Sequence, residues 1–293
     1  LFPQAAWRAQ PIGRPILGTP ETVMGFDADA LRTYLGRHYR GPGMVFSAAG
    51  AVEHDEIVRL VSEQFADLPS DTGPDVAAAA YSGGSLIEAR DLTETQIVLG
   101  FPGVGTRDTD YFAVQALATL LGGGMSSRLF QEVREQRGLC YSIYAFHWGF
   151  ADTGVFGVHA ATGPEDVAEL MPVVVDELAR VIDDVDGEEV GRAKAQLRAG
   201  LLMARERSSA RASQMARHIL THGRIIGPDE LVGLIDAVDV EAVRAVARRL
   251  LSGAAPTLAA VGAVDNVPEI GWIAERMASP GQPVPRRRMA TTG

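Results

Sequence analysis

Several features that would identify a function at once are missing from this sequence of 293 residues. A single cysteine, Cys140, excludes an intramolecular disulfide framework and any CxxC metal site. No apolar run approaches the roughly 18 residues that a membrane helix needs. Lys and Arg total 27 against 37 Asp and Glu, and this formal charge of −10 argues against a nucleic-acid surface. We therefore expect a protein of a reducing, cytoplasmic compartment with no nucleic-acid partner and no membrane span.

The motifs of hydrolytic metal sites are also missing, because neither HExxH nor HxxEH occurs. The nearest pattern is His218 and His222, two imidazoles one helical turn apart, a spacing that can place both on one metal. No Glu lies between them and no third ligand is nearby, which favours exposed or capping histidines. Cys140 has no positioned base and is expected to be a small buried residue. We predict no metal site in this chain.

Local signals in the first part of the chain alternate between helix and strand. Thr19 is expected to cap a helix that begins with Pro20, and Asp27 a second helix. The apolar run at 44–49 is bounded by glycines and predicts a buried strand. Residues 69–90, rich in Pro, Gly and Ala, predict a linker.

A longer unit follows the linker, over residues 91–275. Strands are expected over 95–101, 141–150, 154–161 and 256–261. Helices are expected over 111–121, 126–137 with Ser126 as its cap, 165–182, a long stretch at 187–222, and from Asp239 onward. The tail, 276–293, is expected to be disordered.

An internal repeat sets the organisation of the chain. Residues 27–52 match residues 239–264 without a gap, at an offset of 212 (239 − 27). The alternative is that two helix–strand units merely share generic patterning. In the second copy about 145 residues separate the strand at Thr95 from Asp239, whereas only 26 residues precede Asp27. We therefore expect roughly 120 residues of the first copy to be absent from this sequence.

Two groups of residues could carry chemistry. Gly122, Gly123 and Gly124 precede a helix, where free amides can bind an anion, although a tight helix–helix connection is the alternative. Arg134 lies in the last turn of that helix, and Tyr141 begins the next strand after the break at Gly138. A guanidinium and a phenol aimed at one point suit a polarised peptide carbonyl or an oxyanion. On spacing alone, a surface Arg and a core Tyr remain the alternative.

The run LFQEVREQRGLCYSI at 129–143, preceded by GGGMSSR at 122–128, resembles the C-terminal domain of the inverzincin peptidases of family M16. These include pitrilysin, insulin-degrading enzyme and processing-peptidase β subunits, and the bacterial processing-peptidase-like branch is the most similar. Residues 11–21 resemble a loop late in their N-terminal domain. The resemblance implies an α/β (α+β) fold of two homologous domains, each a mainly antiparallel sheet with helices packed on one face, enclosing a peptide-binding chamber. Residues 1–68 would then be the remaining part of a truncated first copy, and 91–275 the metal-free second copy.

The resemblance also implies a function. This chain would be the C-terminal portion of a zinc-dependent metalloendopeptidase of peptides or unfolded polypeptides, assembled as a homodimer or with a paired subunit. Zinc would belong to the intact protein, with no ligand here, so the fragment alone is expected to be inactive. Arg134 and Tyr141 fall on the family's substrate-contacting Arg and Tyr, and Gly122, Gly123, Gly124 and Ser126 on its substrate-binding loop. The alternative is a non-catalytic partner or scaffold subunit, although the longer glycine-rich loop of non-catalytic α subunits is missing.

Overall fold

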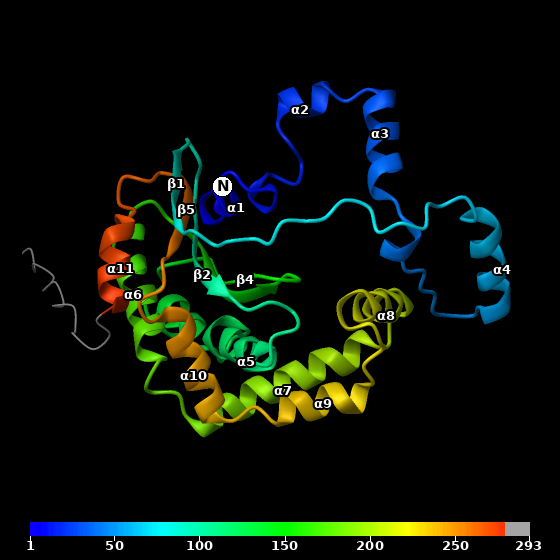
Figure 1. The fold of residues 1–293 in the computed structure, drawn as a ribbon. Coiled ribbons are helices and arrows are strands. Elements are labelled where there is room, and N and C mark those ends of the chain that lie inside the picture. The colour runs from blue at the N-terminus through cyan, green and yellow to red at the C-terminus, as the bar shows by residue number, and fades with distance from the viewer. Residues whose placement is uncertain (279–293) are drawn as a thin grey trace, which may run out of the picture.

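The computed structural model describes residues 1–278. The expected disordered tail therefore lies outside the described residues from position 279 onward, while its first three residues end helix α11 (Ile270–Ala278). Most of the chain forms one body around a sheet, and an arm of three helices extends from it (Figure 1). Within the described residues, no helix combines the length and apolarity needed to cross a membrane.

The body is built on a five-stranded, mainly antiparallel sheet, as predicted. Its strands follow the order β1-β5-β2-β4-β3, and only the β1–β5 pair is parallel. The strands are β1 (Gly84–Ala89), β2 (Thr95–Gly103), β3 (Ser142–Gly149), β4 (Gly154–Thr162) and β5 (Thr257–Gly262). Strand β1 lies inside the segment expected to be only a linker, where it forms one edge of the sheet. Strand β3 forms the other edge.

Helices cover one face of this sheet, as Figure 1 shows for α5, α6 and α10. Their bounds are α5 (Tyr111–Gly122), α6 (Val167–Arg180), α7 (Gly187–Ala204), α8 (Ser208–His222), α9 (Pro228–Asp236) and α10 (Val240–Leu251). Alternate strand residues point into this layer, since Ile97, Leu99 and Phe101 of β2 are at most 2% exposed and belong to one core with these helices. The expected long helix at 187–222 is in fact two, interrupted at 205–207.

The opposite face of the sheet carries the start of the chain. Helix α1 (Phe2–Ala6) and Trp7 pack against Val155 of β4 and Ala259 of β5. Tyr81 completes this layer, with its hydroxyl 2.6 Å from the Thr257 Oγ1 and 3.2 Å from the Gly100 carbonyl oxygen. Residues 1–13, which the sequence grouped with the first repeat, therefore lie against the sheet of the second unit.

The arm consists of α2 (Pro20–Met24), α3 (Ala28–His38) and α4 (His54–Gln64), with a short 3₁₀ turn at Gly41–Gly43. A second 3₁₀ turn, Pro11–Gly13, comes before the arm and lies with α1 on the body. Its local structure repeats that of the body. Asp27 caps α3 by accepting a 2.8 Å hydrogen bond from the Ala30 N–H, and Asp239 caps α10 in the same way through Ala242, also at 2.8 Å. Gly50 and Gly262 share a backbone conformation that favours glycine, with φ of 134° and 131°. The two copies therefore fold alike locally.

The two copies differ in burial. Leu31 is 55% exposed and Phe46 is 44% exposed, whereas their counterparts Val243 and Leu258 are fully buried. Among the described residues 14–82, none is buried. The prediction of a buried strand over 44–49 is wrong in this structure, because that segment pairs with no strand of residues 1–278, while its counterpart β5 lies between β1 and β2. The apolar side of the arm thus lacks the layer that β2 and the helices supply to the second copy.

Candidate functional site

The predicted site lies where α5 ends, the chain forms a short helical turn, and β3 begins. That turn, η3 (Phe130–Glu135), is a π-helix. The Gln136 N–H donates to the Gln131 carbonyl at 2.9 Å, one residue further than an α-helix allows. Gly138, with φ of 68°, then reverses the chain toward β3. π turns are frequent at functional sites, so the π turn at Phe130–Glu135 agrees with a functional role for the side chains near it.

Arg134 and Tyr141 come from the two sides of this reversal. The Arg134 guanidinium lies over the Phe130 ring, 4.6 Å from its centroid. Tyr141 is 75% exposed, and its backbone is held by a 3.0 Å hydrogen bond from its N–H to the Ala161 carbonyl. Tyr141 is thus a surface residue, so the alternative of a core Tyr is wrong. In the part of the chain that the structure describes, no hydrogen bond joins the two side chains, and both keep donors for a third group.

Cys140 lies between Arg134 and Tyr141 in sequence, and its thiol is buried. Burial raises the pKa of its thiol to about 11, although the positive charge of Arg134 acts in the opposite direction. The thiol is therefore protonated at neutral pH, which suits a small buried side chain and not a nucleophile.

The glycine loop that precedes η3 has mixed surroundings. Gly122 is buried, and an added Cβ would lie 2.0 Å from the Ala145 backbone nitrogen, so glycine is needed there for close packing of α5 on β3. Gly123 and Ser126 are exposed, and Gly124 is half-buried. Ser126 does not cap η3, whose N-terminus has no side-chain cap. The neighbouring Ser127 instead closes the turn, donating from its Oγ to the Gly124 carbonyl at 2.6 Å.

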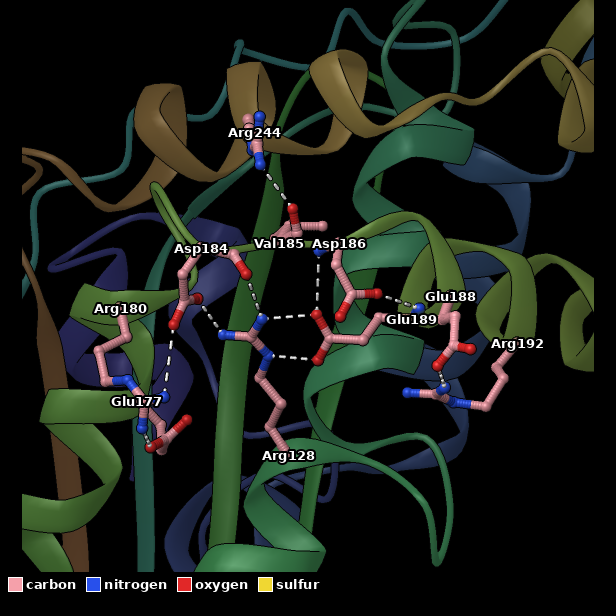
Figure 2. A network of polar contacts seen from close by, with 10 residues as sticks. All are labelled: Arg128, Glu177, Arg180, Asp184, Val185, Asp186, Glu188, Glu189, Arg192 and Arg244. Carbon is pink, nitrogen blue, oxygen red and sulfur yellow. Dashed lines mark hydrogen bonds and ion pairs between the residues drawn. The ribbon is translucent and has the colours of Figure 1, made fainter.

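Arg128 is a residue that sequence reasoning left without a role. Its side chain is 12% exposed, and its Nε and Nη2 each donate to one Glu189 carboxylate oxygen at 2.6 Å (Figure 2). It also contacts the Asp184 carboxylate, and donates to the Asp184 carbonyl at 3.0 Å. Burial alone would lower the pKa of Arg128, but these hydrogen bonds and charges outweigh it and raise the pKa above its ordinary value. These partners are 56 and 61 residues away in sequence, so no local pattern could have indicated them.

His147 and His218 each make a structural hydrogen bond. His147 is buried, and its Nε2 lies 3.0 Å from the Val104 carbonyl oxygen. His218 accepts the Ile226 N–H on its Nδ1 at 3.2 Å, which ties the end of α8 to the segment after it. His222 lies one turn away, with 6.2 Å between the ring centroids. Within residues 1–278, no group of three or more His, Cys, Asp or Glu side chains is arranged to hold a metal ion. The chain as described does not fit a zinc centre.

Comparison with known proteins places this arrangement in a family. Residues 25–197 match the peptidase M16 inactive domain. The chain belongs to peptidase family M16. It is 37% identical over 272 residues to an uncharacterised zinc protease of Streptomyces coelicolor, covering 89% of this chain and 59% of that protein. A second uncharacterised zinc protease, from Mycobacterium bovis, is 39% identical over 259 residues, covering 86% of this chain and 59% of that protein. A third, from Rickettsia bellii, is 33% identical over 262 residues (89% and 63%).

These relatives are longer than this M16 chain, which spans about three fifths of their length. Among solved structures, a chain in complex III of Candida albicans with Inz-5 bound superimposes with a TM-score of 0.84 at 21% identity, over 94% of this chain and 68% of that one. At that identity the likeness establishes the fold. The mixed α/β architecture and the M16 family are therefore established, the relatives are named zinc proteases, and the roles of Arg134, Tyr141 and the glycine loop stay predictions.

Proposed function

We propose that this M16 chain is the metal-free, substrate-contacting part of a zinc metalloendopeptidase that acts on peptides or unfolded polypeptides. The observation that carries the proposal is the chain reversal at Gly138, which separates Arg134 on the preceding turn from the exposed Tyr141 at the start of the next strand. The zinc-protease names of the relatives support the reaction class. Since residues 1–278 do not fit a metal site, the zinc of the intact protein would be held by residues other than these.

The chemistry expected of the two side chains is hydrogen bonding to a peptide. A guanidinium donates to a carbonyl oxygen most strongly as negative charge develops on that oxygen, and a phenol adds a second donor. The Phe130 ring beneath Arg134 restricts the guanidinium, so less freedom is lost when a peptide binds. The glycine loop adds less, because the Gly123 N–H already donates to the Thr119 carbonyl at 2.8 Å.

The test uses the intact protein with Arg134→Ala and Tyr141→Phe, and Arg137→Ala as the matched control. Arg137 lies just after the same turn but is engaged by Glu132 at 2.6 Å. Removing one transition-state donor lowers turnover by roughly 100-fold or more. We therefore expect Arg134→Ala to lower turnover on an unfolded polypeptide such as β-casein while zinc content stays at the wild-type level. Turnover equal to that of Arg137→Ala would contradict the assigned role.

A second candidate function is a non-catalytic partner or scaffold subunit, and the close fold match to a chain in a complex III structure favours it. Under this reading the intact protein binds polypeptide or a partner subunit without cleaving it. A homodimer or a paired-subunit assembly, with a chamber between homologous domains, fits either candidate. Hydrolysis of β-casein by the zinc-loaded intact protein separates the two, since a scaffold subunit would leave the substrate whole.

A further inference from the structure

Helix α7 contacts the glycine loop at two points. Glu189 and Gln196 are seven residues apart, which places both on one face of the helix, about two turns from each other. Glu189 binds Arg128 at the far end of the loop through two 2.6 Å hydrogen bonds. Gln196 donates from its Nε2 to the Gly123 carbonyl at the near end. The loop that carries the predicted substrate contacts is therefore fastened to a rigid helix on both sides.

The Glu189 side chain is held in position by several hydrogen bonds. The Glu189 side chain is 13% exposed, and one of its oxygens also accepts the Asp186 N–H at 3.2 Å. Asp186 in return accepts the Glu189 N–H at 2.9 Å, which forms a capping box at the start of α7. Figure 2 shows the Arg128 guanidinium enclosed between Glu189 and Asp184. A bidentate, mostly buried pair of this kind fixes orientation as well as distance.

Asp184 is itself held in place. Its carboxylate lies 3.4 Å from Arg180, which also binds the buried Glu177 at 2.5 Å. The segment between α6 and α7 is thus braced from the α6 side, so Arg128 meets two partners whose positions are already set. A displacement of Arg128 would move η3, because Arg128 lies two residues before that turn begins.

We propose that Glu189 and Gln196 are positioning residues: α7 clamps the glycine loop and η3 so that Arg134 meets an extended polypeptide in one geometry. The inference rests on the proposed function and deepens it, because it assigns the precision of the peptide contact to side chains that do not touch peptide. It also explains why loop residues that are exposed, Gly123 and Ser126, can be held without packing of their own.

The test compares Glu189→Gln with Glu188→Gln in the intact protein. Gln can still serve at the third helical position of a capping box, but it offers Arg128 one neutral acceptor in place of a bidentate carboxylate. Glu188 is the adjacent residue, with a side chain 89% exposed and a 3.5 Å contact to Arg192. A third variant, Gln196→Ala, loosens the other end of the clamp and serves if Glu189→Gln folds poorly.

Two readouts are measured, amide hydrogen exchange over residues 122–137 and the Kd for fluorescein-labelled β-casein. We expect faster exchange and a Kd raised by roughly tenfold in Glu189→Gln and Gln196→Ala, with Glu188→Gln like the wild type. Unchanged exchange would overturn the clamp. Faster exchange with an unchanged Kd would overturn its role in positioning. Hydrogen exchange measures mobility and the Kd measures binding, and neither requires hydrolysis. If the protein binds β-casein without hydrolysing it, the peptidase proposal fails, but these two measurements still test the clamp.

Discussion

Replacing Gly122 with Ala tests the packing that holds the glycine loop against the sheet. The added Cβ would lie 2.0 Å from the Ala145 nitrogen, 2.8 Å from the Tyr144 carbonyl carbon and 2.9 Å from the Ala145 Cβ. Ordinary contact begins near 3.4 Å, so α5 and β3 would have to separate by about 1.4 Å (3.4 − 2.0). The two shortest contacts are to backbone atoms and the third is to a Cβ, so no side-chain rotation can relieve them.

Overpacking of this kind costs about 1–3 kcal/mol, and a backbone obstruction belongs at the upper end. For a domain of this size each kcal/mol lowers the Tm by about 2–4 °C, so we expect a decrease of about 6–12 °C. Gly124→Ala is the matched control from the same loop, since its Cβ would meet only the flexible end of Gln196, at 3.4 Å. Thermal unfolding followed by circular dichroism measures both variants. Equal Tm values for the two would refute the packing argument.

Two further predictions concern protonation and metal. Burial lowers the pKa of His147 below 6.5, so the unfolded chain gains a proton first as pH falls, and the free energy of unfolding decreases below about pH 6.5. The free energy of unfolding, measured in urea at pH 7.5 and 5.5, should decrease less for His147→Gln than for the wild type, the difference being at most about 1.4 kcal/mol per pH unit. Equal decreases in the two proteins would contradict a contribution from His147. The 293-residue chain alone should bind no stoichiometric zinc and cleave no β-casein; elemental analysis finding one tightly held zinc per chain would count against that assignment.

Much of the fold could be predicted because its signals are local. Asp27 and Asp239 each have a side chain that can cap a helix and are followed by apolar residues at helical spacing. This pattern predicts a helix after each, and both helices form as expected. The repeat at an offset of 212 extends this to backbone detail, since Gly50 and Gly262 adopt the same conformation. Such features depend on a few neighbouring residues and are therefore visible in sequence.

The sequence-based predictions were wrong or incomplete for features that depend on residues far away in the sequence. Residues 44–49 have the pattern of a buried strand, but a strand needs a neighbour, and the described chain supplies one only to the second copy. Strand β1 was hidden in a Pro-, Gly- and Ala-rich segment because its pairing with β5 joins residues far apart in sequence. Arg128 was missed for the same reason, since Glu189 and Asp184 come from another helix and the segment before it.

The candidate site was predicted in part. Sequence resemblance selected Arg134 and Tyr141, and the structure adds the π turn and the reversal at Gly138 that present them. It also separates the loop glycines, because Gly122 has a packing reason to be glycine and Gly124 has no such close neighbour. This distinction depends on the approach of β3, which no local pattern encodes.

If the surface at Tyr141 contacts a polypeptide substrate, a photoreactive group placed there should crosslink to that polypeptide. A photoreactive amino acid replaces Tyr141 in the intact protein, with the same replacement at Leu234, 43% exposed on α9, as the control. We expect labelled β-casein to crosslink to the residue at position 141 and not to the residue at position 234. Unlabelled β-casein should compete for the crosslink at position 141. Equal capture from both positions, or none from position 141, would contradict this expectation.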